Sequence, residues 1–310
     1  MIYTLTLSPA LDYLVWLDHF EPGALNRTSQ TAFRAGGKGI NVSVVLSRLG
    51  YQSICLGFTA GFVGRELVRM LDEEGIRHNF IHSENGCTRI NVKIKADTES
   101  EINGYGPRVS EEELQKLMAQ AAGLQKGDVL ILSGNPPKNL PSDIYSKIID
   151  AVPTDVSVVV DSSGAHLLSA LTKHPFLIKP NKAELEEICG ENLDSTGKIA
   201  AAAMELREKG AQNVLVSLGA GGGLLAADDG GVYTCSTPEG KLIDSTGAGD
   251  SMVAGFVAQT LSGANKAECL RFAVACGCAS TYSYELLDAD RLRKVYEKTP
   301  RPSQYNLFDW

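Results

Sequence analysis

The chain has 310 residues, of which 44% are hydrophobic and 21% charged, so it is long enough for one large globular α/β domain or two smaller ones. Its formal net charge of -8 argues against general affinity for nucleic acid or for anionic membranes. Clustered cationic side chains are therefore expected to serve a local site.

The seven cysteines include no Cys-x-x-Cys pair and no cysteine or histidine spacing typical of a zinc site, so we expect reduced thiols. The first residues carry no basic segment followed by a long apolar core. No apolar run approaches the ~18 residues that a membrane-spanning helix needs. We expect a cytoplasmic protein.

Residues 2–7 predict a first strand, because threonine alternates with bulky apolar side chains up to Ser8-Pro9. Asp12 follows this strand. Since the carboxyl ends of strands in open α/β sheets face the ligand crevice, Asp12 is a candidate for binding a hydroxylated substrate. An aspartate that satisfies turn amides is an equally good interpretation. Residues 13–17 predict another short strand.

A glycine-rich turn at Gly36, Gly37 and Gly39 precedes a helix predicted over residues 42–49. Glycines in such a turn let the backbone approach a ligand closely. The chain contains no Gly-x-x-x-x-Gly-Lys-Ser/Thr, so the turn is not a P-loop. Position 42 is Val, where a Gly-x-Gly-x-x-Gly dinucleotide fingerprint needs its last glycine.

Residues 51–80 predict a βα unit with its helix at 65–74. The next segment, 88–95, alternates strictly, with Ile90, Val92 and Ile94 on one face and Arg89, Asn91, Lys93 and Lys95 on the other. A cationic face suits a sugar phosphate. The alternative is an amphipathic edge strand whose lysines oppose aggregation, and we favour it for Lys95.

From residue 108 onward the βα alternation is regular. Helices are predicted over 111–123, 143–151 and 264–280, and strands over 129–132, 156–160, 176–179 and 214–219. This alternation with short connections predicts a mostly parallel sheet in a three-layer sandwich. Asn181 and Glu184 fit a capping box. The glycine-rich turn at 219–223 is a candidate bed for a nucleotide.

The sequence Gly247-Ala248-Gly249-Asp250 runs into the apolar segment 252–261. Three residues without bulk at the start of a helix point backbone N–H groups at one spot, where the helix dipole adds positive potential, and so form an anion hole. Asp250 stands at its rim and could accept a proton from an attacking hydroxyl. Alternatively, Asp250 is an ordinary first-turn acid. The following helix is apolar nearly all round and therefore buried, which favours a functional role for Asp250.

Together, Gly36-Gly37-Lys38-Gly39-x-Asn41 and Gly247-Ala248-Gly249-Asp250 resemble the signatures of the ribokinase-like (PfkB) family of sugar kinases. The resemblance covers essentially the whole chain. It implies an α/β fold, a ribokinase-like three-layer α/β/α sandwich with a mostly parallel central sheet, in a single kinase domain of residues 1–310. The implied core is 1–12, 35–86 and 108–310, with a small inserted β lid at 13–34 and 87–107.

The same resemblance implies ATP and Mg²⁺ as cofactors and assigns roles to the residues that match. Asp250 would be the catalytic base, and the transferring phosphoryl group would be stabilised by Gly247, Ala248 and Gly249. Sugar hydroxyls would be held by Asp12, Gly37 and Asn41, and a phosphate on the sugar by Lys38, Arg89, Lys93 and Arg27. The nucleotide would be bound by Lys179, Asn181, Glu184, Ser217, Gly219 and Gly222, with Glu184 near Mg²⁺ through a water.

Within the family, residues 88–93 and 101–107 look like the lid of the bacterial kinases that phosphorylate D-fructose 1-phosphate at its 6-hydroxyl, so this sugar phosphate is the expected acceptor. Tagatose 6-phosphate and fructose 6-phosphate are the alternatives, because charge does not distinguish the three. The loop at 133–137 reads Ser-Gly-Asn-Pro-Pro, where the family pattern has Ser-Leu-Pro after the glycine.

The apolar face formed by Ile90, Val92 and Ile94 needs cover, so we expect a homodimer through the lid, as similar family members form. Two other classes of function are alternatives. A nicotinamide dehydrogenase would need the intact dinucleotide fingerprint, which the chain lacks. A non-catalytic sugar-phosphate sensor would keep residues 36–41 but lose Asp250 or the anion hole, and the chain retains both.

Overall fold

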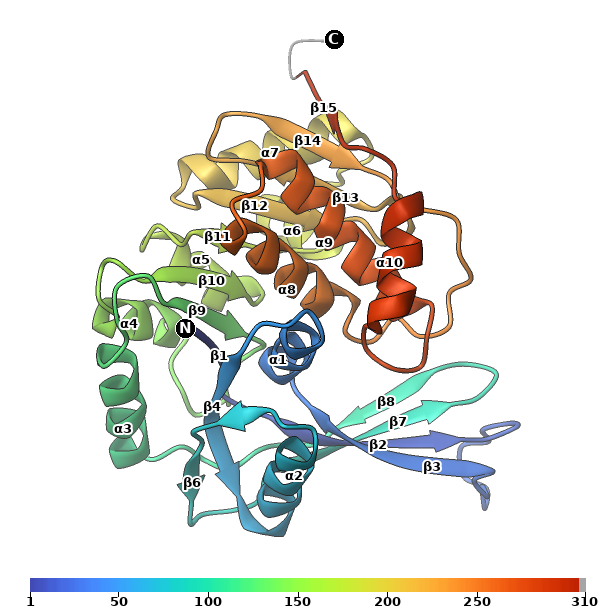
Figure 1. Ribbon diagram of the computed structural model, residues 1–310. Coiled ribbons are helices and arrows are strands. Elements are labelled where there is room, and N and C mark those ends of the chain that lie inside the picture. Colours follow the sequence, from blue (N-terminus) through green and yellow to red (C-terminus); the bar gives the residue numbers. More distant parts are fainter. Residues whose placement is uncertain (307–310) are drawn as a thin grey trace.

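A large sheet crosses the centre of this computed structural model, which describes residues 1–306, and a smaller sheet projects to one side (Figure 1). The strands of the large sheet are β1 (Ile2–Thr6), β4 (Ser53–Ala60), β5 (Arg77–His78), β6 (Ile81–Ser83), β9 (Val129–Ser133), β10 (Ser157–Asp161), β11 (Leu177–Ile178), β12 (Asn213–Ser217), β13 (Gly223–Ala226), β14 (Val232–Cys235) and β15 (Ser303–Gln304). Their order is β15-β14-β13-β12-β11-β10-β9-β1-β4-β5, and β6 also pairs with β4.

Most of this sheet is parallel, and only the pairs that involve β13, β14 and β15 are antiparallel. Its central strands are short runs of buried Val, Ile and Leu, as expected for a parallel sheet covered on both faces. Along β9, Leu130 and Leu132 belong to one core cluster, whereas Val129 and Ile131 belong to the other. The sheet therefore separates two hydrophobic cores.

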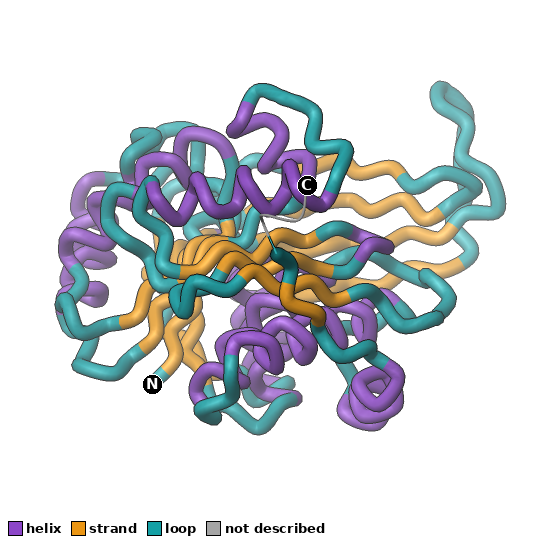
Figure 2. The backbone as a smooth tube through the Cα atoms, turned by 90° about the horizontal axis from the view of Figure 1, so that it is seen from above, coloured by secondary structure: helices purple, strands orange, loops and turns teal. Residues whose placement is uncertain are grey.

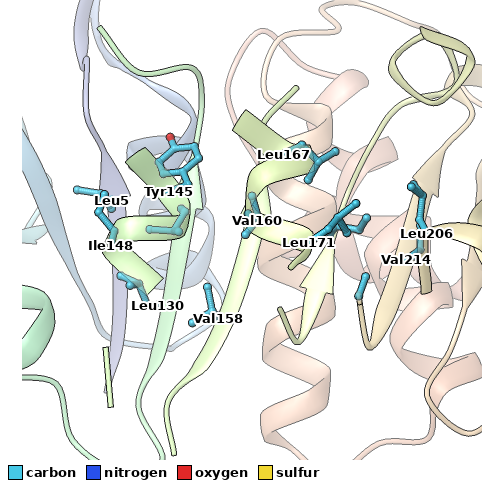
Figure 3. Close-up of a cluster of buried hydrophobic side chains, with 14 of the residues drawn as sticks. Leu5, Leu130, Tyr145, Ile148, Val158, Val160, Leu167, Leu171, Leu206 and Val214 are labelled. Atoms are coloured by element: carbon cyan, nitrogen blue, oxygen red, sulfur yellow. The ribbon is translucent and has the colours of Figure 1, made fainter. Parts of the chain in front are cut away.

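Helices cover both faces of the sheet (Figure 2). The core on one face, part of which is drawn in Figure 3, includes residues of α3 (Glu111–Ala122), α4 (Ile144–Ala151), α5 (Gly164–Leu171), α6 (Lys182–Cys189) and α7 (Thr196–Glu208). The core on the other face includes residues of α1 (Lys38–Arg48), α8 (Ala248–Leu261), α9 (Lys266–Thr281) and α10 (Ala289–Lys298). A third, smaller cluster includes residues of α2 (Gly61–Glu73). The expected three-layer α/β/α sandwich is confirmed.

The smaller sheet, called the lid sheet below, consists of β2 (Ala10–Trp16), β3 (Gln30–Gly36), β7 (Arg89–Lys95) and β8 (Ser100–Asn103) in the order β3-β2-β7-β8. The pair β2 and β7 is parallel, with Asp12 opposite Asn91 and Trp16 opposite Lys95. Since side chains alternate along a strand, Asp12, Asn91 and Lys93 lie on one face of this sheet. That face lines the crevice described below.

Two expectations about these strands need correction. The alternative interpretation of residues 88–95 as an edge strand, which we favoured for Lys95, is wrong, because β7 lies between β2 and β8 and is an inner strand of the lid sheet. The second strand starts at Ala10 rather than at residue 13, so Asp12 lies within a strand and not in the turn after the first one. The helix predicted from residue 42 starts at Lys38, directly after the glycine turn.

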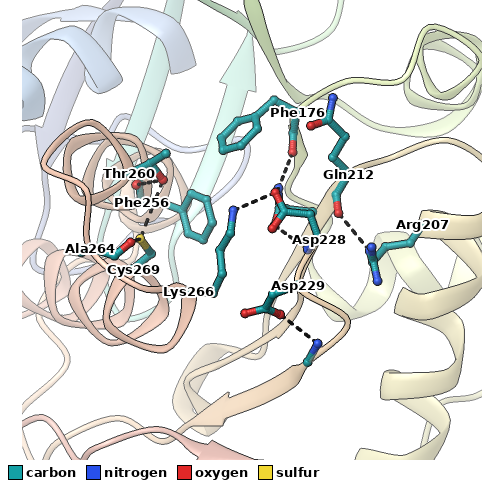
Figure 4. Close-up of polar contacts among 12 residues, drawn as sticks. Phe176, Arg207, Gln212, Asp228, Asp229, Phe256, Thr260, Ala264, Lys266 and Cys269 are labelled. Carbon is teal, nitrogen blue, oxygen red and sulfur yellow. Dashed lines mark hydrogen bonds and ion pairs between the residues drawn. The ribbon is translucent and has the colours of Figure 1, made fainter.

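The amino end of β12 is closed by a polar network (Figure 4). Nδ2 of the buried Asn213 donates to the carbonyl of Phe176 at 2.9 Å and to Oδ2 of Asp228 at 3.2 Å, and Lys266 binds the same carboxylate oxygen at 2.9 Å. These polar groups satisfy one another. The open site lies at the other end of the strand, where Ser217 lines a cavity.

Among residues 1–306, no helix combines the length and the apolar character that crossing a membrane requires.

Candidate active site

The helix α8 begins with an uncapped turn. Gly247 is its N-cap residue, in the left-handed conformation with φ 76°, and no side chain caps the helix. Ala248 N–H donates to the carbonyl of Ser245 at 3.3 Å, whereas the N–H groups of Gly249 and Asp250 have no acceptor within the described residues. Because unsatisfied donors at a helix N-terminus bind anions, this turn has the geometry of an anion hole.

Asp250 is buried in the first turn of α8, with 5% of its surface exposed. Asn41, from α1, donates through Nδ2 to Oδ2 of Asp250 at 2.7 Å. Burial and the negative charge of Asp161 raise the pKa of Asp250 to about 6, against the opposing effect of Lys38. A carboxylate with a pKa in this range is ionised at neutral pH and is a better proton acceptor than an exposed aspartate.

Two lysines are held together beside the anion hole by Asp161, at the carboxyl end of β10. Its Oδ1 lies 3.1 Å from Nζ of Lys38 and 3.3 Å from Nζ of Lys179. Burial alone would raise the pKa of Asp161, but the two lysines outweigh it and lower the pKa below its usual range. A Cβ atom at Gly249 would lie 3.0 Å from Nζ of Lys179, so that ammonium group adjoins the anion hole.

Asp161 was not among the site residues predicted from the sequence. The available signal was its position at the carboxyl end of a buried strand, where side chains face the crevice of an open α/β sheet.

A cavity of about 410 Å³ lies between the lid sheet and the anion hole. Among its lining residues are the expected Asp12, Gly37, Lys38, Asn41, Arg89, Lys93, Lys179, Asn181, Ser217, Gly247, Gly249 and Asp250. Asn91 and Asn103, which the sequence analysis did not select, also line it. The cavity thus places hydroxyl-binding, cationic and proton-accepting groups around one space.

Asp12 is fixed at the back of this cavity. Its Oδ1 accepts from Nδ2 of Asn91 at 2.8 Å, and burial raises its pKa although Lys93 acts in the opposite direction. A Cβ atom at Gly36 would lie 2.6 Å from the carboxyl group of Asp12, so only glycine leaves room for this carboxylate.

The two lid cations differ in their partners. Lys93 forms an ion pair with Glu101 at 2.5 Å. Arg89 donates through Nε to the carbonyl of Ser8 at 3.1 Å and has no carboxylate partner within the described residues. Burial lowers the pKa of Arg89 because its charged form loses water. Arg89 is therefore a half-buried cation that no carboxylate within the described residues pairs directly, although the charge of Asp12 acts on it from a greater distance.

A second cavity, of about 590 Å³, begins on the other side of the anion hole. The expected Asn181, Ser217, Gly219, Gly222, Ala248 and Gly249 line it. Its bed is the short 3₁₀ turn Gly219–Gly221, and a Cβ atom at Gly222 would lie 2.0 Å from a backbone carbonyl. The volume is within the range of small-molecule sites, and it meets the first cavity at Gly249.

Two expected residues line neither cavity. Arg27 is exposed on the loop between β2 and β3. Glu184 forms the predicted capping box of α6, in which its Oε2 accepts from the backbone N–H of Asn181 at 2.8 Å. Since Asn181 lines both cavities, Glu184 lies next to them, and its other carboxylate oxygen is not used by the capping box.

Comparison with known proteins agrees with this geometry. The 1-phosphofructokinase of Bacillus subtilis is 43% identical over 287 residues, which cover 92% of this chain and 94% of that protein. The D-tagatose-1-phosphate kinase of Bacillus licheniformis is 35% identical, with 94% and 96% covered. The tetrameric inhibited form of Escherichia coli phosphofructokinase-2 superposes with a TM-score of 0.89 at 30% identity, with 96% and 98% covered.

Residues 6–288 match the family described as pfkB carbohydrate kinases. With an anion hole, a buried base and two adjoining cavities in place, this chain therefore belongs to the pfkB family and is an ATP-dependent sugar kinase.

Proposed function

We propose that the protein transfers the γ-phosphoryl group of ATP to the 6-hydroxyl of D-fructose 1-phosphate, giving fructose 1,6-bisphosphate and ADP. We call the cavity of about 410 Å³ between the lid sheet and the anion hole the sugar cavity. The observation that carries this proposal is Arg89, a half-buried cation in the sugar cavity without a carboxylate partner. A buried charge is costly unless it is paired, and a substrate that already bears a phosphate supplies the missing anion. The similarity to the 1-phosphofructokinase of Bacillus subtilis supports the choice of ketose.

In this proposal Asp250 orients the 6-hydroxyl and accepts its proton as the oxygen attacks phosphorus. The free N–H groups at Gly249 and Asp250 bind the oxygens of the transferring phosphoryl group, where negative charge is spread in the transition state. Lys38 and Lys179 adjoin the same turn through Asp161. We therefore assign Lys38 to the transferring phosphoryl group rather than to the phosphate already on the sugar.

The remaining residues orient the two substrates. Asp12, Gly37 and Asn41 bind sugar hydroxyls. Arg89 with Lys93 binds the 1-phosphate. Ser217, Gly219 and Gly222 bind the nucleotide in the cavity of about 590 Å³.

Mg²⁺ fits the donors that this chain offers. Mg²⁺ is usually bound by one or two carboxylates together with substrate phosphates and waters, rather than by a cage of protein ligands. Among residues 1–306 no cluster of three or more His, Cys, Asp or Glu side chains could hold a metal. The carboxylate oxygen of Glu184 that the capping box does not use is available to a hydrated ion. When bound, Mg²⁺ would neutralise charge on the nucleotide phosphates.

D-tagatose 1-phosphate is the second candidate acceptor, because a kinase for it is 35% identical to this chain over most of both lengths. The two ketoses share the 1-phosphate and the 6-hydroxyl and differ in configuration at C4. Arg89 and Asp250 would serve both equally, so the choice falls to the groups that hold the ring hydroxyls, such as Asp12 and Asn91.

The decisive assay compares kcat/KM of the purified enzyme for fructose 1-phosphate, tagatose 1-phosphate, fructose 6-phosphate and tagatose 6-phosphate, following ADP release. We expect fructose 1-phosphate to be best. A preference for either 6-phosphate would overturn the position of the phosphate site. Phosphate-dependent binding without turnover would instead indicate a sugar-phosphate sensor.

Arg89→Ala tests the residue that carries the proposal. Since hydrogen bonds to charged groups are worth ~1.5–3 kcal/mol, kcat/KM for the true acceptor should fall roughly 10- to 150-fold. The KM for ATP should change little, because Arg89 lines only the sugar cavity. Equal losses for phosphorylated and unphosphorylated ketoses would show that Arg89 does not bind the phosphate.

We also propose that the protein is a homodimer in which the outer faces of two lid sheets meet. Ile102, Phe33 and Ile90 are 61%, 53% and 37% exposed on that face, whereas Ile94 is already buried within one chain. A second copy offers the same apolar face in a symmetric, self-complementary contact. The similarity to a kinase that forms a tetramer supports an oligomer.

A further inference from the structure

The lid sheet touches the core at the end opposite to Arg89. Trp16 and Lys95 are the last residues of β2 and β7 and lie directly opposite each other in the register. The ring of Trp16 meets the ring of Tyr284 edge-on, with 6.4 Å between the centroids. Nζ of Lys95 lies 3.2 Å from Oδ1 of Asp244. The contact with Asp244 joins the lid sheet to the loop before α8. The contact with Tyr284 joins it to the loop after α9.

The ion pair between Lys95 and Asp244 is nearly enclosed. The two side chains are 10% and 4% exposed, which contradicts the interpretation of Lys95 as an edge-strand lysine that opposes aggregation. Lys95 also pairs with Glu99 in the lid, so its charge has a partner without Asp244. A buried ion pair between two separate parts of a fold needs a reason, because desolvation makes such pairs a weak source of stability.

Asp244 belongs to the segment that leads into the anion hole. The same oxygen that binds Lys95, Oδ1, accepts from the backbone N–H of Thr246 at 2.9 Å. The N–H of Asp244 donates in turn to the carbonyl of Thr281 at 3.2 Å. Thr246 directly precedes Gly247, whose left-handed conformation starts the turn of the anion hole. One carboxylate therefore fixes both the lid and the backbone that enters the anion hole.

A cavity of about 630 Å³ lies between the lid sheet and the core, next to the sugar site. It is lined by Asp12 and Lys93 from the lid sheet, by Asn41 from α1, and by Asp244, Thr246 and Tyr284 from the core. Asp12, Asn41 and Lys93 also line the sugar cavity. Asp244 thus lines the space in which the lid meets the acceptor site, and Lys95 binds this carboxylate from the lid.

We propose that Lys95 and Asp244 form a latch that couples the docked position of the lid to the geometry of the anion-hole turn, which makes Lys95 a positioning residue for phosphoryl transfer. The inference rests on the proposed function in one respect, namely that the lid carries the acceptor and the turn carries the phosphoryl group. With the latch in place, the groups that hold the sugar and those that stabilise the transferring phosphoryl group are fixed relative to one another. Without it, the lid can still bind sugar, but the two sets lose their alignment, to which reaction rates are sensitive.

The kinetic test uses Lys95→Met, Asp244→Asn and the double variant, with Asp97→Asn as the matched control. Asp97 forms an exposed ion pair with His19 inside the lid, at 2.9 Å, and does not reach the core. We expect Lys95→Met to lower kcat at saturating substrates by about 10-fold, the worth of one hydrogen bond to a charged group. The KM for ATP should remain unchanged. Lys95→Arg, which keeps the charge, should restore most of the activity.

The double variant should be no slower than the slower single variant, because both changes break the same contact. Effects that multiply in the double variant would overturn the latch. So would a loss confined to the KM of the acceptor with kcat unchanged, since that result means that Lys95 only helps the lid to bind sugar. Should Lys95→Met fail to fold, Asp244→Asn alone is assessed by the same criteria, because Asn keeps an oxygen for the N–H of Thr246 but carries no charge to pair with Lys95.

A second readout does not depend on which substrate the enzyme uses. The sequence contains two tryptophans, Trp16 and Trp310, so Trp310→Phe leaves Trp16 as the only one. In that background, acrylamide should quench Trp16 more strongly in Lys95→Met than in Asp97→Asn, because the lid no longer docks. If no ketose phosphate is turned over but quenching rises, the proposed function fails and the latch stands. Unchanged quenching with an active enzyme overturns the latch alone.

Discussion

Asp250 and Asp161 are two buried carboxylates in one site whose surroundings move their pKa values in opposite directions. Burial raises the pKa of Asp250 to about 6, and the charge of Asp161 adds to that effect. Asp161 is buried as well, but Lys179 and Lys38 lower its pKa. Such divergence separates the acid–base roles of neighbouring carboxylates. Asp161 is held as a permanent anion, and Asp250 is the group that can take up a proton.

Asp250→Asn should lower kcat by ~10²–10⁴-fold while ATP binding is kept, because an amide cannot accept the proton of the hydroxyl. In the unmodified enzyme, kcat should fall toward acid pH with an apparent pKa near the value of about 6 for Asp250, since the protonated acid is not a base. Both are measured by steady-state kinetics over a range of pH, with ATP affinity determined separately. Turnover close to that of the original enzyme in the variant would remove Asp250 from this role.

The same substitution should stabilise the fold at neutral pH. The folded-state pKa of Asp250 lies above the unfolded value, so between about pH 4 and pH 6 the folded protein binds more protons, and this carboxyl group costs stability progressively as the pH rises. Asn carries no charge to bury and keeps an oxygen that can accept from Asn41. The melting temperature of Asp250→Asn should therefore exceed that of the original protein at about pH 7.5 and approach it at about pH 4. A lower melting temperature at both pH values would contradict the raised pKa.

At the scale of single elements, two helices begin with the same capping motif, but only one of them adjoins the site. Ser110 with Glu113 forms a capping box at α3, and Asn181 with Glu184 forms one at α6. Only Asn181 also lines the two site cavities. Comparing substitutions at the caps of α3 and α6 therefore separates the contribution of a cap to stability from its contribution to the site.

Ser110→Ala and Asn181→Ala should each lower the free energy of unfolding by about 1 kcal/mol, the usual worth of an N-cap. Only Asn181→Ala should also raise the KM for ATP or the Mg²⁺ concentration needed for half-maximal rate. Urea unfolding and steady-state kinetics on both variants decide this. If Ser110→Ala weakens ATP use as much, the kinetic effect comes from general destabilisation and Asn181 has no separate role at the nucleotide.

The sequence predicted the parts of the site that are local in the chain. Gly247, Gly249 and Asp250 form a turn and a helix start within four residues, and the capping box of α6 spans four residues as well. Short motifs of this kind restrict the backbone directly, through glycine conformations and hydrogen bonds between near neighbours. The regular βα alternation likewise gave the three-layer sandwich, because each unit carries its own hydrophobic period.

The parts that were missed depend on distant partners. Asp161 gains its role from Lys38, 123 residues away in the chain, and Lys95 gains its role from Asp244. Alternation along β7 shows two faces but does not say which strands flank it, so an inner strand looked like an edge strand. The resemblance assigned Lys38 to a phosphate on the sugar, and the fold brings its Nζ to 3.1 Å from Asp161 beside the anion hole, so the choice between the two phosphoryl groups stays a prediction.

At the scale of the whole molecule, the lid sheet is the part with an incomplete environment. One of its faces lines the sugar cavity and is polar, whereas the outer face leaves Ile102, Phe33 and Ile90 exposed at 61%, 53% and 37%. An exposed apolar face of this kind on a thin sheet marks an interaction surface. In the proposed dimer a second lid would supply matching apolar groups.

We therefore expect light scattering to give about twice the 33.2 kDa of one chain across a wide concentration range. Ile102→Glu should shift the protein toward the monomer, because a dimer related by a two-fold axis would bury the new carboxylate twice. Phe62→Glu is the matched control, since Phe62 is 67% exposed on α2 and lies outside the lid sheet. If the original protein scatters as a monomer, or if Phe62→Glu dissociates it as readily as Ile102→Glu does, the two lid sheets do not form the interface.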